Sequence, residues 1–416
     1  MHKFYEPCKS KVELLIYRVA DFIYLCKMIN RILYTDLLKA LKNFPSLAIL
    51  GARQTGKTTL AKQLAKQQKR KSIYLDLENP SDRDKLHDAF TYLDDNKEKL
   101  ILLDEVQRMP ELFAMLRSLI DRHRKSGRFI LLGSASPHLV KGVSESLAGR
   151  IFNSHLGGIT LLEYGDKMPL KKHWFRGGFP DMLTAKSNLL FTQRMDTFIS
   201  TFIERDLQNL FGVQFTATVM RTFWQMLANA NGGIWNAQNY ARSLGITAPT
   251  VNRYLDFLEG SFMVHRLPAF YFNARKRIVR APKIYLRDSG IVHRLLKLTA
   301  FEDLQGHPAI GSSWEAYVVE QIYQLKHPNI DLFYYRTQDG AEADVVLTKA
   351  GKPVACIEIK LSNSPSLSKG FFVCLDDLKT SRNFVVIPTG ESYRKSTTLR
   401  VCCLHDFLQN QLPKIK

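Results

Sequence analysis

Residues 47–64 read LAILGARQTGKTTLAKQL, and this stretch decides the fold of the first part of the chain. The run Gly51–Thr58 fits the pattern G-x-x-x-x-G-K-[ST] without a mismatch. An apolar run, Leu47–Leu50, precedes it with the length of a buried strand, and a charged, helix-forming segment, Thr58–Gln68, follows it. The sequence therefore predicts a strand, a glycine-containing loop and a helix in direct succession.

A loop of this kind binds phosphate groups. Its glycines let the backbone wrap around an anion, and the N–H groups at the start of the next helix donate to that anion. Lys57 can reach the β- and γ-phosphates, while the Thr58 hydroxyl can ligate Mg²⁺. We therefore expect ATP and Mg²⁺ as cofactors. The residues expected to hold them are Gly51, Ala52, Arg53, Gln54, Thr55, Gly56, Lys57, Thr58 and Thr59.

An acidic pair completes this site. The apolar run Leu100–Leu103 leads directly into Asp104 and Glu105. Open α/β sheets bind ligands at the carboxyl ends of their strands, so Asp104 is expected to hold Mg²⁺ through water. Glu105 is expected to orient or deprotonate the attacking water. An apolar run followed by two acids is common by itself, but here it follows Lys57 by 47 residues, with one predicted strand between them.

Short apolar runs alternate with helical segments from residue 46 to about 155. This alternation indicates a parallel sheet with helices on both faces, a three-layer α/β fold of the P-loop NTPase class. Past residue 155 the alternation fades into a helical region. The expected strands are Leu47–Leu50, Ile73–Leu77, Leu100–Leu103 and Phe129–Leu132, with helices such as Thr58–Gln68 and Glu111–Arg124 between them.

Three further polar residues are candidates for this site. Ser134 follows the strand Phe129–Leu132 and can contact the γ-phosphate or the attacking water, although serine is equally ordinary in such a turn. Arg150 and Arg205 are candidates to supply positive charge to the transition state, and surface salt bridges are the alternative for both. We name Lys57, Glu105, Ser134 and Arg150 as the expected catalytic residues.

Together these motifs resemble a large group of bacterial and archaeal AAA+-like ATPases with a restriction-endonuclease-like C-terminal domain. The shared motifs are Gly51–Thr58, Leu103–Gln107, Leu132–Ser134, Ser146–Arg150, Gly177–Pro180 and Ile203–Leu207. The resemblance runs from about Met28 to the end. It implies an N-terminal extension over 1–27, an ATPase domain over 28–160, a helical and winged-helix region over 161–290 and a nuclease-like domain over 291–416. Translation from Met1 and from Met28 are both left open.

Residues 236–258 have the length and the central glycine, Gly245, of a helix–turn–helix. Polar residues are expected on the outer face of its second helix: Thr247, Thr250, Asn252 and Arg253. A basic run follows in an expected hairpin: Arg275, Lys276, Arg277, Arg280, Lys283 and Arg287. Such density of positive charge can neutralise successive DNA phosphates. The alternative is a winged helix that packs against the ATPase domain.

The C-terminal part carries a nuclease-like pattern. Glu342-Ala-Asp344 precedes Ile357-Glu358-Ile-Lys360, which resembles the D-x(n)-E-x-K pattern of the restriction-endonuclease superfamily. Period-two spacing sends Glu358 and Lys360 to one face of one strand. The resemblance implies a metal held by Glu315, Asp344 and Glu358, with Lys360 beside it. A solvated strand face is the alternative, and such domains can also bind nucleic acid without cutting it.

Composition and charge indicate the expected partners and the cellular compartment of the protein. The chain has 416 residues, 59 Lys and Arg against 39 Asp and Glu, and a net charge of +20, which attracts polyanions or simply reflects a solvated basic surface. Six scattered cysteines form no zinc pattern and suit a reducing cytosol. Four charges interrupt the apolar stretch Val12–Ile29, each costing about 2.5–3.5 kcal/mol in a bilayer centre, so we expect a soluble cytoplasmic protein.

The sequence thus predicts a Mg²⁺-dependent ATPase that couples nucleotide state to nucleic-acid binding or processing. Its expected partners are ATP and nucleic acid, DNA rather than RNA, with no membrane, and a homo-oligomer is left open. The alternative is a nucleotide-switched regulatory or protein-binding module with an inactive nuclease-like domain.

Overall fold

Five parallel strands form the sheet of the first lobe, with order β2-β3-β4-β1-β5. We describe a computed structural model of the chain, covering residues 29–134, 146–165, 169–212, 215–271 and 278–416. The N-terminal extension over 1–27 and the basic residues Arg275, Lys276 and Arg277 lie outside the described residues. The strands are β1 Ser46–Leu50, β2 Ser72–Asp76, β3 Leu100–Asp104, β4 Phe129–Gly133 and β5 Ile151–His155. The register aligns the start of β1 with the starts of β4 and β5.

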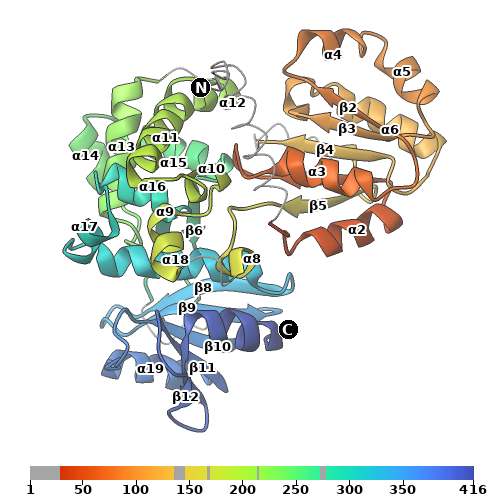
Figure 1. The fold of residues 1–416 in the computed structure, drawn as a ribbon. Helices are drawn as coiled ribbons and strands as arrows, with labels where there is room; N and C mark the ends of the chain where they lie inside the picture. The colour runs from red at the N-terminus through yellow and green to blue at the C-terminus, as the bar shows by residue number, and fades with distance from the viewer. Residues whose placement is uncertain (1–28, 135–145, 166–168, 213–214, 272–277) are drawn as a thin grey trace, which may run out of the picture.

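Helices cover both faces of this sheet, as Figure 1 shows in red and orange. Alternate residues of β1 explain why: Leu47 and Ile49 pack in one apolar cluster with α2 and α3, while Ala48 and Leu50 pack in another with α5 and α6. The lobe is therefore a three-layer α/β domain, which we call the P-loop domain (residues 29–160). Its helices are α2 Tyr34–Asn43, α3 Lys57–Lys66, α4 Pro80–Asp84, α5 Ala89–Asp95, the 3-10 turn η1 Val106–Arg108 and α6 Leu112–Arg122.

The second lobe is mainly helical and spans residues 161–305; we call it the helical region. Helix α11 continues through a π-helical turn, η3, into α12. Helices α14 and α15 are joined at Gly245, whose positive φ of 66° ends α14. Its elements are α8 Leu161–Tyr164, α9 Leu170–Arg176, α10 Pro180–Leu183, α11 Asn188–Thr201, η3 Phe202–Asp206, α12 Leu207–Phe211, α13 Ala217–Asn229, α14 Ala237–Leu244, α15 Ala248–Gly260, β6 Val264–Leu267, β7 Lys283–Leu286, α16 Ser289–Leu295 and α17 Phe301–Gln305.

The third lobe contains a six-stranded mixed sheet of order β12-β13-β11-β10-β9-β8; we call residues 306–416 the C-terminal unit. It lies below the helical region in Figure 1, drawn in blue. Helix α19 covers one face of the sheet and α18 the other. The elements are α18 Ile310–Leu325, β8 Ile330–Arg336, β9 Glu342–Lys349, β10 Lys352–Ile359, α19 Lys369–Leu378, β11 Arg382–Ile387, β12 Tyr393–Arg394, β13 Leu399–Cys403, α20 Leu404–Asp406, η4 Phe407–Gln411 and η5 Leu412–Lys414.

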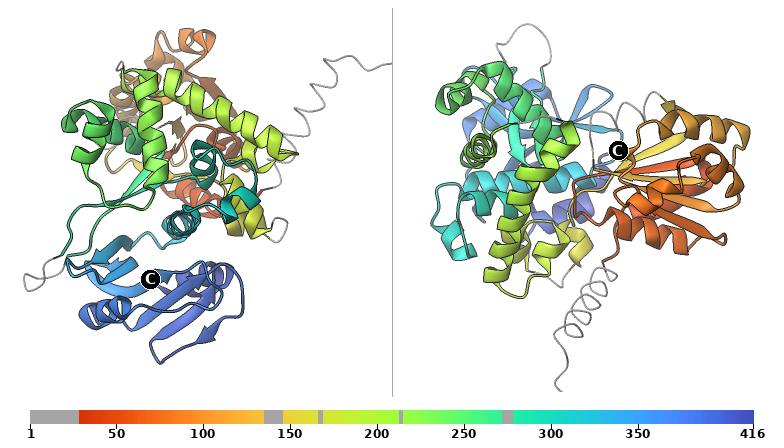
Figure 2. Two further views of the ribbon diagram at one scale, coloured as in Figure 1. Left: turned by 90° about the vertical axis from the view of Figure 1, so that its left-hand side faces the viewer. Right: turned by 90° about the horizontal axis from the view of Figure 1, so that it is seen from above.

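The helical region and the C-terminal unit share one hydrophobic core. A single apolar cluster includes Phe202 and Trp224 of the helical region together with Trp314 of α18 and Ile357 of β10. Helix α18 lies between the two parts and is buried over most of its length. Figure 2 shows the helical region and the C-terminal unit from two further directions. The two parts are therefore packed as one body.

The parallel three-layer sheet confirms the fold class expected for the first domain. All four expected strands are present within one or two residues of their predicted ends. The fifth strand, β5, was not expected. Helices α16 and α17 pack against α9 and its neighbours, and we therefore describe them with the helical region, to Gln305. The reason is that the hydrophobic residues of α16, such as Ile291 and Val292, belong to the shared core.

Trp314 tests the shared core. Its side chain is 1% exposed, its ring lies 5.1 Å from that of Trp174, and its Nε1 donates to the Lys360 carbonyl at 3.1 Å. Trp314→Ala leaves a large cavity and an unpaired carbonyl, so it should lower the free energy of unfolding by about 3–5 kcal/mol. Urea titration followed by circular dichroism measures this change. Leu189→Ala, at a side chain that is 69% exposed, is the control and should change it by less than about 0.5 kcal/mol. Equal effects would contradict the shared core.

Candidate functional site

The loop Gly51–Gly56 connects the carboxyl end of β1 to the start of α3. Gly56 has φ +92°, a left-handed conformation that favours glycine. At Gly51 a Cβ atom would lie 2.2 Å from the Leu156 carbonyl oxygen, so only glycine fits there. The two glycines of the motif are therefore required by the backbone path of this loop, whatever it binds.

Lys57 folds back over this loop. Its Nζ donates to the carbonyl oxygens of Gly51 at 3.0 Å and Ala52 at 2.8 Å, and the residue is 6% exposed. Burial lowers the pKa of Lys57, while the nearby carboxylates of Glu105 and Asp104 raise it. The ammonium group therefore lies at the loop Gly51–Gly56.

Asp104, at the end of β3, lies directly beside the start of α3. Its Oδ2 accepts from the Thr58 hydroxyl at 2.7 Å and from the Tyr74 hydroxyl at 2.9 Å, and its Oδ1 accepts from the Glu105 N–H at 3.0 Å. Sequence reasoning missed Tyr74. Burial and the neighbouring Asp104 raise the pKa of Tyr74, so it stays a hydroxyl donor. The hydroxyl and carboxylate expected to hold Mg²⁺ are thus in direct contact.

The strand order places Ser134 between these groups. Because β4 lies between β1 and β3, the residue after β4 emerges between the loop and Asp104. Ser134 is 2% exposed, and its hydroxyl has no hydrogen-bond partner among the described residues. A buried polar group without a partner is costly, and one at a binding site is explained by a partner that comes with the ligand.

Glu105 follows Asp104 in a left-handed backbone conformation, with φ +54°. Few residues other than glycine, asparagine and aspartate adopt this conformation readily, so the turn carries backbone strain. The side chain accepts a hydrogen bond from Gln107. Burial raises the pKa of Glu105, whereas Lys57 and Gln107 lower it. A raised pKa suits a group that accepts a proton.

A cavity of about 420 Å³ opens along this loop, between the P-loop domain and the helical region. This volume is typical of small-molecule sites. Gln54 to Leu60 form one wall and the apolar side chains of Ile29, Ile159 and Pro180 another, while Glu105, Arg205 and Asp206 complete it. The nine residues expected to bind ATP therefore surround one cavity or form the loop beneath it.

Arg31 supports the loop from outside and was not expected from the sequence. Its guanidinium donates to the carbonyl oxygens of Thr55 at 3.0 Å, Gly157 at 2.9 Å and Gly158 at 3.0 Å, and to Glu163 at 3.0 Å. One side chain thus joins the phosphate-binding loop to the segment that follows β5. An isolated arginine after Met28 gives no signal of this role in the sequence.

Two arginines connect the loop to the helical region. Arg53, inside the loop, forms an ion pair with Asp206 of η3 and another with Glu78 at 3.1 Å. Arg205 pairs with Asp206 at 3.2 Å, and its side chain is 63% exposed toward the cavity side. Arg205 therefore forms a salt bridge and also lies at the cavity, so the structure agrees with both roles that the sequence left open for it.

The expectation for Arg150 within this site is wrong. Arg150 precedes β5, and β5 runs parallel to β1, so Arg150 lies at the edge of the sheet opposite the loop. Its guanidinium forms a two-bond ion pair with Asp121, at 2.6 and 2.9 Å. This surface salt bridge is the alternative that the sequence left open. Arg150 does not reach the loop of its own chain.

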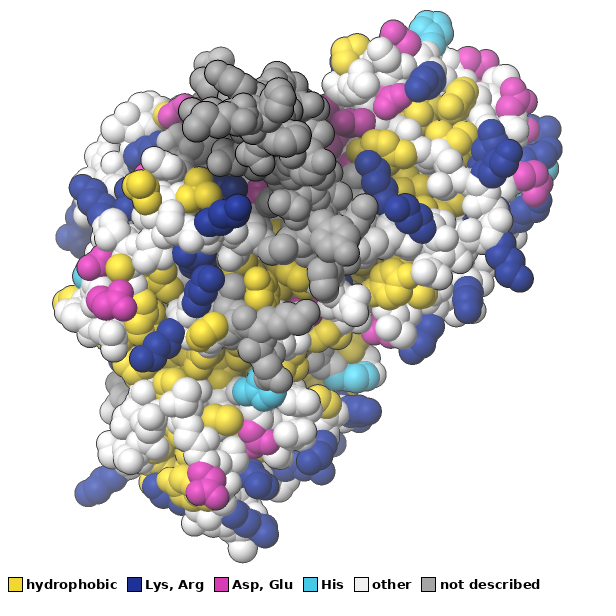
Figure 3. Space-filling view, viewed as in Figure 1, with side chains coloured by type: hydrophobic (Ala, Val, Ile, Leu, Met, Phe, Trp, Pro, Cys, Tyr) yellow, Lys and Arg dark blue, Asp and Glu magenta, His cyan; other side chains and the backbone are white. Residues whose placement is uncertain are grey.

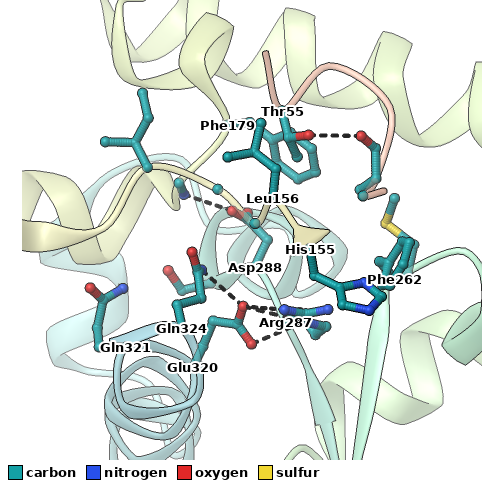
Figure 4. Close-up of a pocket in the computed structure, with 18 of the residues that line it drawn as sticks. Thr55, His155, Leu156, Phe179, Phe262, Arg287, Asp288, Glu320, Gln321 and Gln324 are labelled. Carbon is teal, nitrogen blue, oxygen red and sulfur yellow. Dashed lines mark hydrogen bonds and ion pairs between the residues drawn. The ribbon is translucent and has the colours of Figure 1, made fainter. Parts of the chain in front are cut away.

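A second, smaller cavity of about 40 Å³ lies behind the loop (Figure 4). It joins Thr55 and His155 of the P-loop domain to Arg287 and Asp288 of the helical region and to Glu320 of α18. Arg287 donates three hydrogen bonds to Glu320, at 2.8, 3.0 and 3.2 Å. Burial raises the pKa of Asp288 to about 6, although the N–H groups of Gly178 and Ile291 lower it. All three lobes therefore meet directly behind the phosphate-binding loop.

The shared motif at Gly177 and Gly178 is explained by this junction. Asp288 Oδ2 accepts from the Gly178 N–H at 2.7 Å, and the Gly178 carbonyl accepts from the Ile159 N–H at 2.7 Å. At Gly177, which has φ +75°, a Cβ atom would lie 2.2 Å from Asp288 Oδ1. These glycines are therefore structural and hold α9 to the segment after β5.

The expected metal site of the C-terminal unit is not present as such. Among the described residues, no group of three or more His, Cys, Asp or Glu side chains is arranged to hold a metal ion. Glu315, Asp344 and Glu358 are near one another, and Lys360 pairs with Glu358 at 2.7 Å. However, Lys283 lies among the acids, at 2.9 Å from Glu315, because β7 runs beside α18. A protein cation therefore stands among the expected metal ligands.

Burial and neighbouring charges shift the pKa values of the residues in this cluster. Burial raises the pKa of Asp344, and the neighbouring Glu315 and Glu358 raise it further. Burial by itself lowers the pKa of Lys283, but Glu315, Asp344 and Glu342 raise it above its ordinary value. Lys283 is therefore charged at neutral pH.

Two residues of the expected basic run are not free to contact nucleic acid. Lys283 is 4% exposed within the acidic cluster, and Arg287 pairs with Glu320 at 2.8 Å. Arg280 is exposed. Of the four polar residues expected on the outer face of the second helix, Thr247, Asn252 and Arg253 are exposed, and Thr250 is half-buried. Lys and Arg side chains are spread over all three lobes in the face shown in Figure 3. Charge by itself therefore does not mark one binding surface.

Comparison with known proteins agrees with the lobes. A family model described as an AAA domain matches residues 43–165, and two models for domains of unknown function, DUF8612 and DUF4143, match residues 168–302 and 310–407. Among solved structures, the Walker-type ATPase PABY2304 of Pyrococcus abyssi is 14% identical with a TM-score of 0.46, covering 65% of this chain and 96% of that chain. The RuvB branch migration motor of Thermotoga maritima is 18% identical with a TM-score of 0.29, covering 58% and 90%. Both likenesses are too distant to assign a function.

Among the described residues, no helix combines the length and the apolar character that crossing a membrane requires.

The uncharacterized proteins Rv2008c of Mycobacterium tuberculosis and Mb2031c of Mycobacterium bovis are each 40% identical to this chain over 361 residues, which are 87% of this chain and 80% of each relative. With its P-loop domain matched by the AAA model, the chain therefore belongs to the family of these two mycobacterial proteins and contains an AAA domain of the P-loop ATPase class.

Proposed function

We propose that this protein binds and hydrolyses ATP with Mg²⁺ and passes the nucleotide state to the helical region, which contacts nucleic acid. The observation that carries the ATPase part is the contact of Thr58 with Asp104 at 2.7 Å, beside the Lys57 loop and the Ser134 hydroxyl, which has no partner in the part of the chain that the structure describes. This constellation has a phosphate-binding loop, a magnesium-binding pair and a buried donor at one end of one sheet.

The residues present fit ATP and Mg²⁺. Among the described residues the Ser134 hydroxyl has no hydrogen-bond partner, and the Gly51 position has no room for a Cβ atom. Thr58 and Asp104 offer the hydroxyl and carboxylate oxygens that Mg²⁺ takes beside phosphate oxygens. The bound ion would neutralise charge on the phosphates. Asp104 is held in place by Tyr74, so its orientation does not depend on the ligand.

Each side chain then has a defined task. Lys57 would exchange its bonds with the Gly51 and Ala52 carbonyls for phosphate oxygens. Glu105 would orient a water molecule and accept its proton, a role that its raised pKa suits. Ser134 would donate to a phosphate oxygen or to that water. Arg205 would supply positive charge from the helical region, because it lines the same cavity.

The connection to the helical region rests on Arg53. This residue belongs to the phosphate-binding loop and pairs with Asp206 of η3. A change of the loop on binding or hydrolysis would therefore act directly on the π-helical turn between α11 and α12. Irregular π-helical turns are frequent at functional sites.

Nucleic-acid contact is proposed for the exposed face of α14 and α15. Two helices joined at Gly245 and followed by the antiparallel pair β6 and β7 support the interpretation as a winged helix. Arg242 and Arg253 are exposed there. The net charge of +20 adds a general attraction for polyanions. A protein partner at the same face is the alternative function.

Lys57→Ala should weaken ATP binding about 10- to 100-fold, because a charged hydrogen bond contributes about 1.5–3 kcal/mol. Titration with a fluorescent ATP analogue measures this loss. Lys66→Ala, an exposed lysine on the same helix, is the matched control and should bind as the parent does. If Lys57→Ala binds ATP as tightly as the parent does, the loop Gly51–Gly56 is not the phosphate-binding loop.

Glu105→Gln should keep ATP binding and lower kcat about 10²- to 10⁴-fold, because the amide cannot accept the proton of the attacking water. Phosphate release measured under saturating ATP gives kcat, and the same analogue titration gives binding. Glu111→Gln, at an exposed glutamate, is the control. If Glu105→Gln hydrolyses ATP at the parental rate, another group is the base.

Replacing Arg242 and Arg253 together with alanine should weaken DNA binding and reduce its salt dependence. Each lost phosphate contact should lower the slope of log K against log salt by about 0.9. Fluorescence anisotropy with a labelled duplex at several salt concentrations measures the slope. The double variant Lys39→Ala, Lys42→Ala in α2 removes the same charge from the P-loop domain and is the control. Equal slopes in both variants would mean that nucleic acid binds at another face of the protein.

A further inference from the structure

The Lys283 ammonium lies in a pocket of three carboxylates. Its Nζ is 2.6 Å from Glu342, 2.9 Å from Glu315 and 3.9 Å from Asp344, and its side chain is 5% exposed. Lys283 comes from β7 of the helical region, whereas the acids come from α18 and β9 of the C-terminal unit. One buried cation therefore bridges two lobes.

The carboxylates around Lys283 have further donors. The Tyr285 hydroxyl donates to Glu315 at 2.5 Å, and Arg336 donates to Glu342 at 2.7 Å. The Ile359 N–H donates to Asp344 at 2.8 Å. Buried carboxylates need such donors, because an unpaired buried charge is costly. Those of this pocket are thus already bonded within the chain.

The charges match those that a divalent ion would bring. Lys283 and Arg336 supply two formal positive charges to Glu315, Glu342 and Asp344. A metal ion placed among the same oxygens would meet the Lys283 ammonium at close range and would be repelled by it. The metal that the resemblance to nucleases implies therefore does not fit the residues as they are arranged.

A second buried ion pair lies one turn along. Arg287 directly follows β7 and pairs with Glu320 of α18, and its side chain is 12% exposed. Lys283 with Glu315 and Arg287 with Glu320 thus join the same two elements, β7 and α18. The repetition indicates that these cations fix the position of α18 against the helical region.

We propose that Lys283 takes the place of a divalent metal ion in the nuclease-like site, and that this carboxylate cluster is an interdomain lock instead of a phosphodiesterase centre. Of the acids of the pattern, Glu315 and Asp344 lie on Lys283, while Glu358 pairs with Lys360. Removing the ammonium should turn the cluster into a metal site and weaken the junction.

Manganese titration of the full chain without nucleotide tests this directly. Mn²⁺ binding is measured by calorimetry or by the electron paramagnetic resonance of free Mn²⁺. The parent and Asp344→Asn should bind the same amount of Mn²⁺, because the parent has no Mn²⁺ site that depends on Asp344. Lys283→Met, which keeps the side-chain length and removes the charge, should gain such a site. Its Tm without metal should be lower than that of the parent and should rise on addition of Mn²⁺, whereas the parental Tm should stay unchanged.

Controls separate charge from packing. Lys283→Arg keeps a cation in the pocket and should gain no Mn²⁺ site, and Lys39→Met removes an exposed lysine and should behave as the parent. If Lys283→Met does not fold, the double variant Lys283→Met, Glu315→Gln replaces it in the titration, because it removes one acid together with the cation.

Two results would overturn the proposal. One is an Asp344-dependent Mn²⁺ site in the parent with the affinity found in Lys283→Met. The other is the absence of gained Mn²⁺ binding in the folded variant that lacks the ammonium, Lys283→Met or its double variant, since the cluster would then not be a metal site from which the ammonium excludes the ion.

Discussion

The burial of one helix, α18, is the constraint on which the arrangement of this protein depends. Trp314 and Tyr317 of α18 pack in the core of the helical region, and the same helix lies on the sheet of the C-terminal unit. A helix that is buried on nearly all sides has no free face on which to shift. Its polar residues must therefore find partners in fixed places, and they do so on the helical region and the C-terminal unit.

These partners connect distant parts of the chain. Glu315 binds Lys283, Glu320 binds Arg287, and Gln321 accepts from the Leu161 N–H at 2.8 Å. Leu161 follows the segment whose carbonyl groups bind Arg31, and Arg31 also binds the Thr55 carbonyl of the phosphate-binding loop. Contacts thus run without a gap from the nucleotide loop to the sheet of the C-terminal unit.

The phosphate-binding loop and its acidic pair could be predicted because their chemistry is local. Gly51–Thr58 and the run ending in Asp104 are each continuous in sequence, and a parallel sheet brings strand ends to one edge. Ser134 followed from the same rule. The predicted position of Arg150 differs from the observed one because the rule depends on which end of a strand a residue occupies. The strand β5, which begins just after Arg150, was not expected from the sequence.

The remaining contacts could not be predicted because they are made between segments far apart in sequence. Lys283 and Arg287 looked like part of a basic run, and only the packing of β7 beside α18 turns them into buried ion pairs. Tyr74 and Arg31 are single residues without a pattern around them. The acids Glu315, Asp344 and Glu358 were recognised by spacing, but spacing does not reveal a cation that arrives from another part of the chain.

The shared core of the helical region and the C-terminal unit has a consequence for how the chain divides. The P-loop domain has apolar clusters of its own on both faces of its sheet, whereas the other two lobes have one cluster in common. By its apolar packing the described chain therefore divides into two bodies, not three. The backbone between β5 and α8, which includes Gly157 and Gly158, links them, and the cavity along the phosphate-binding loop lies where they meet.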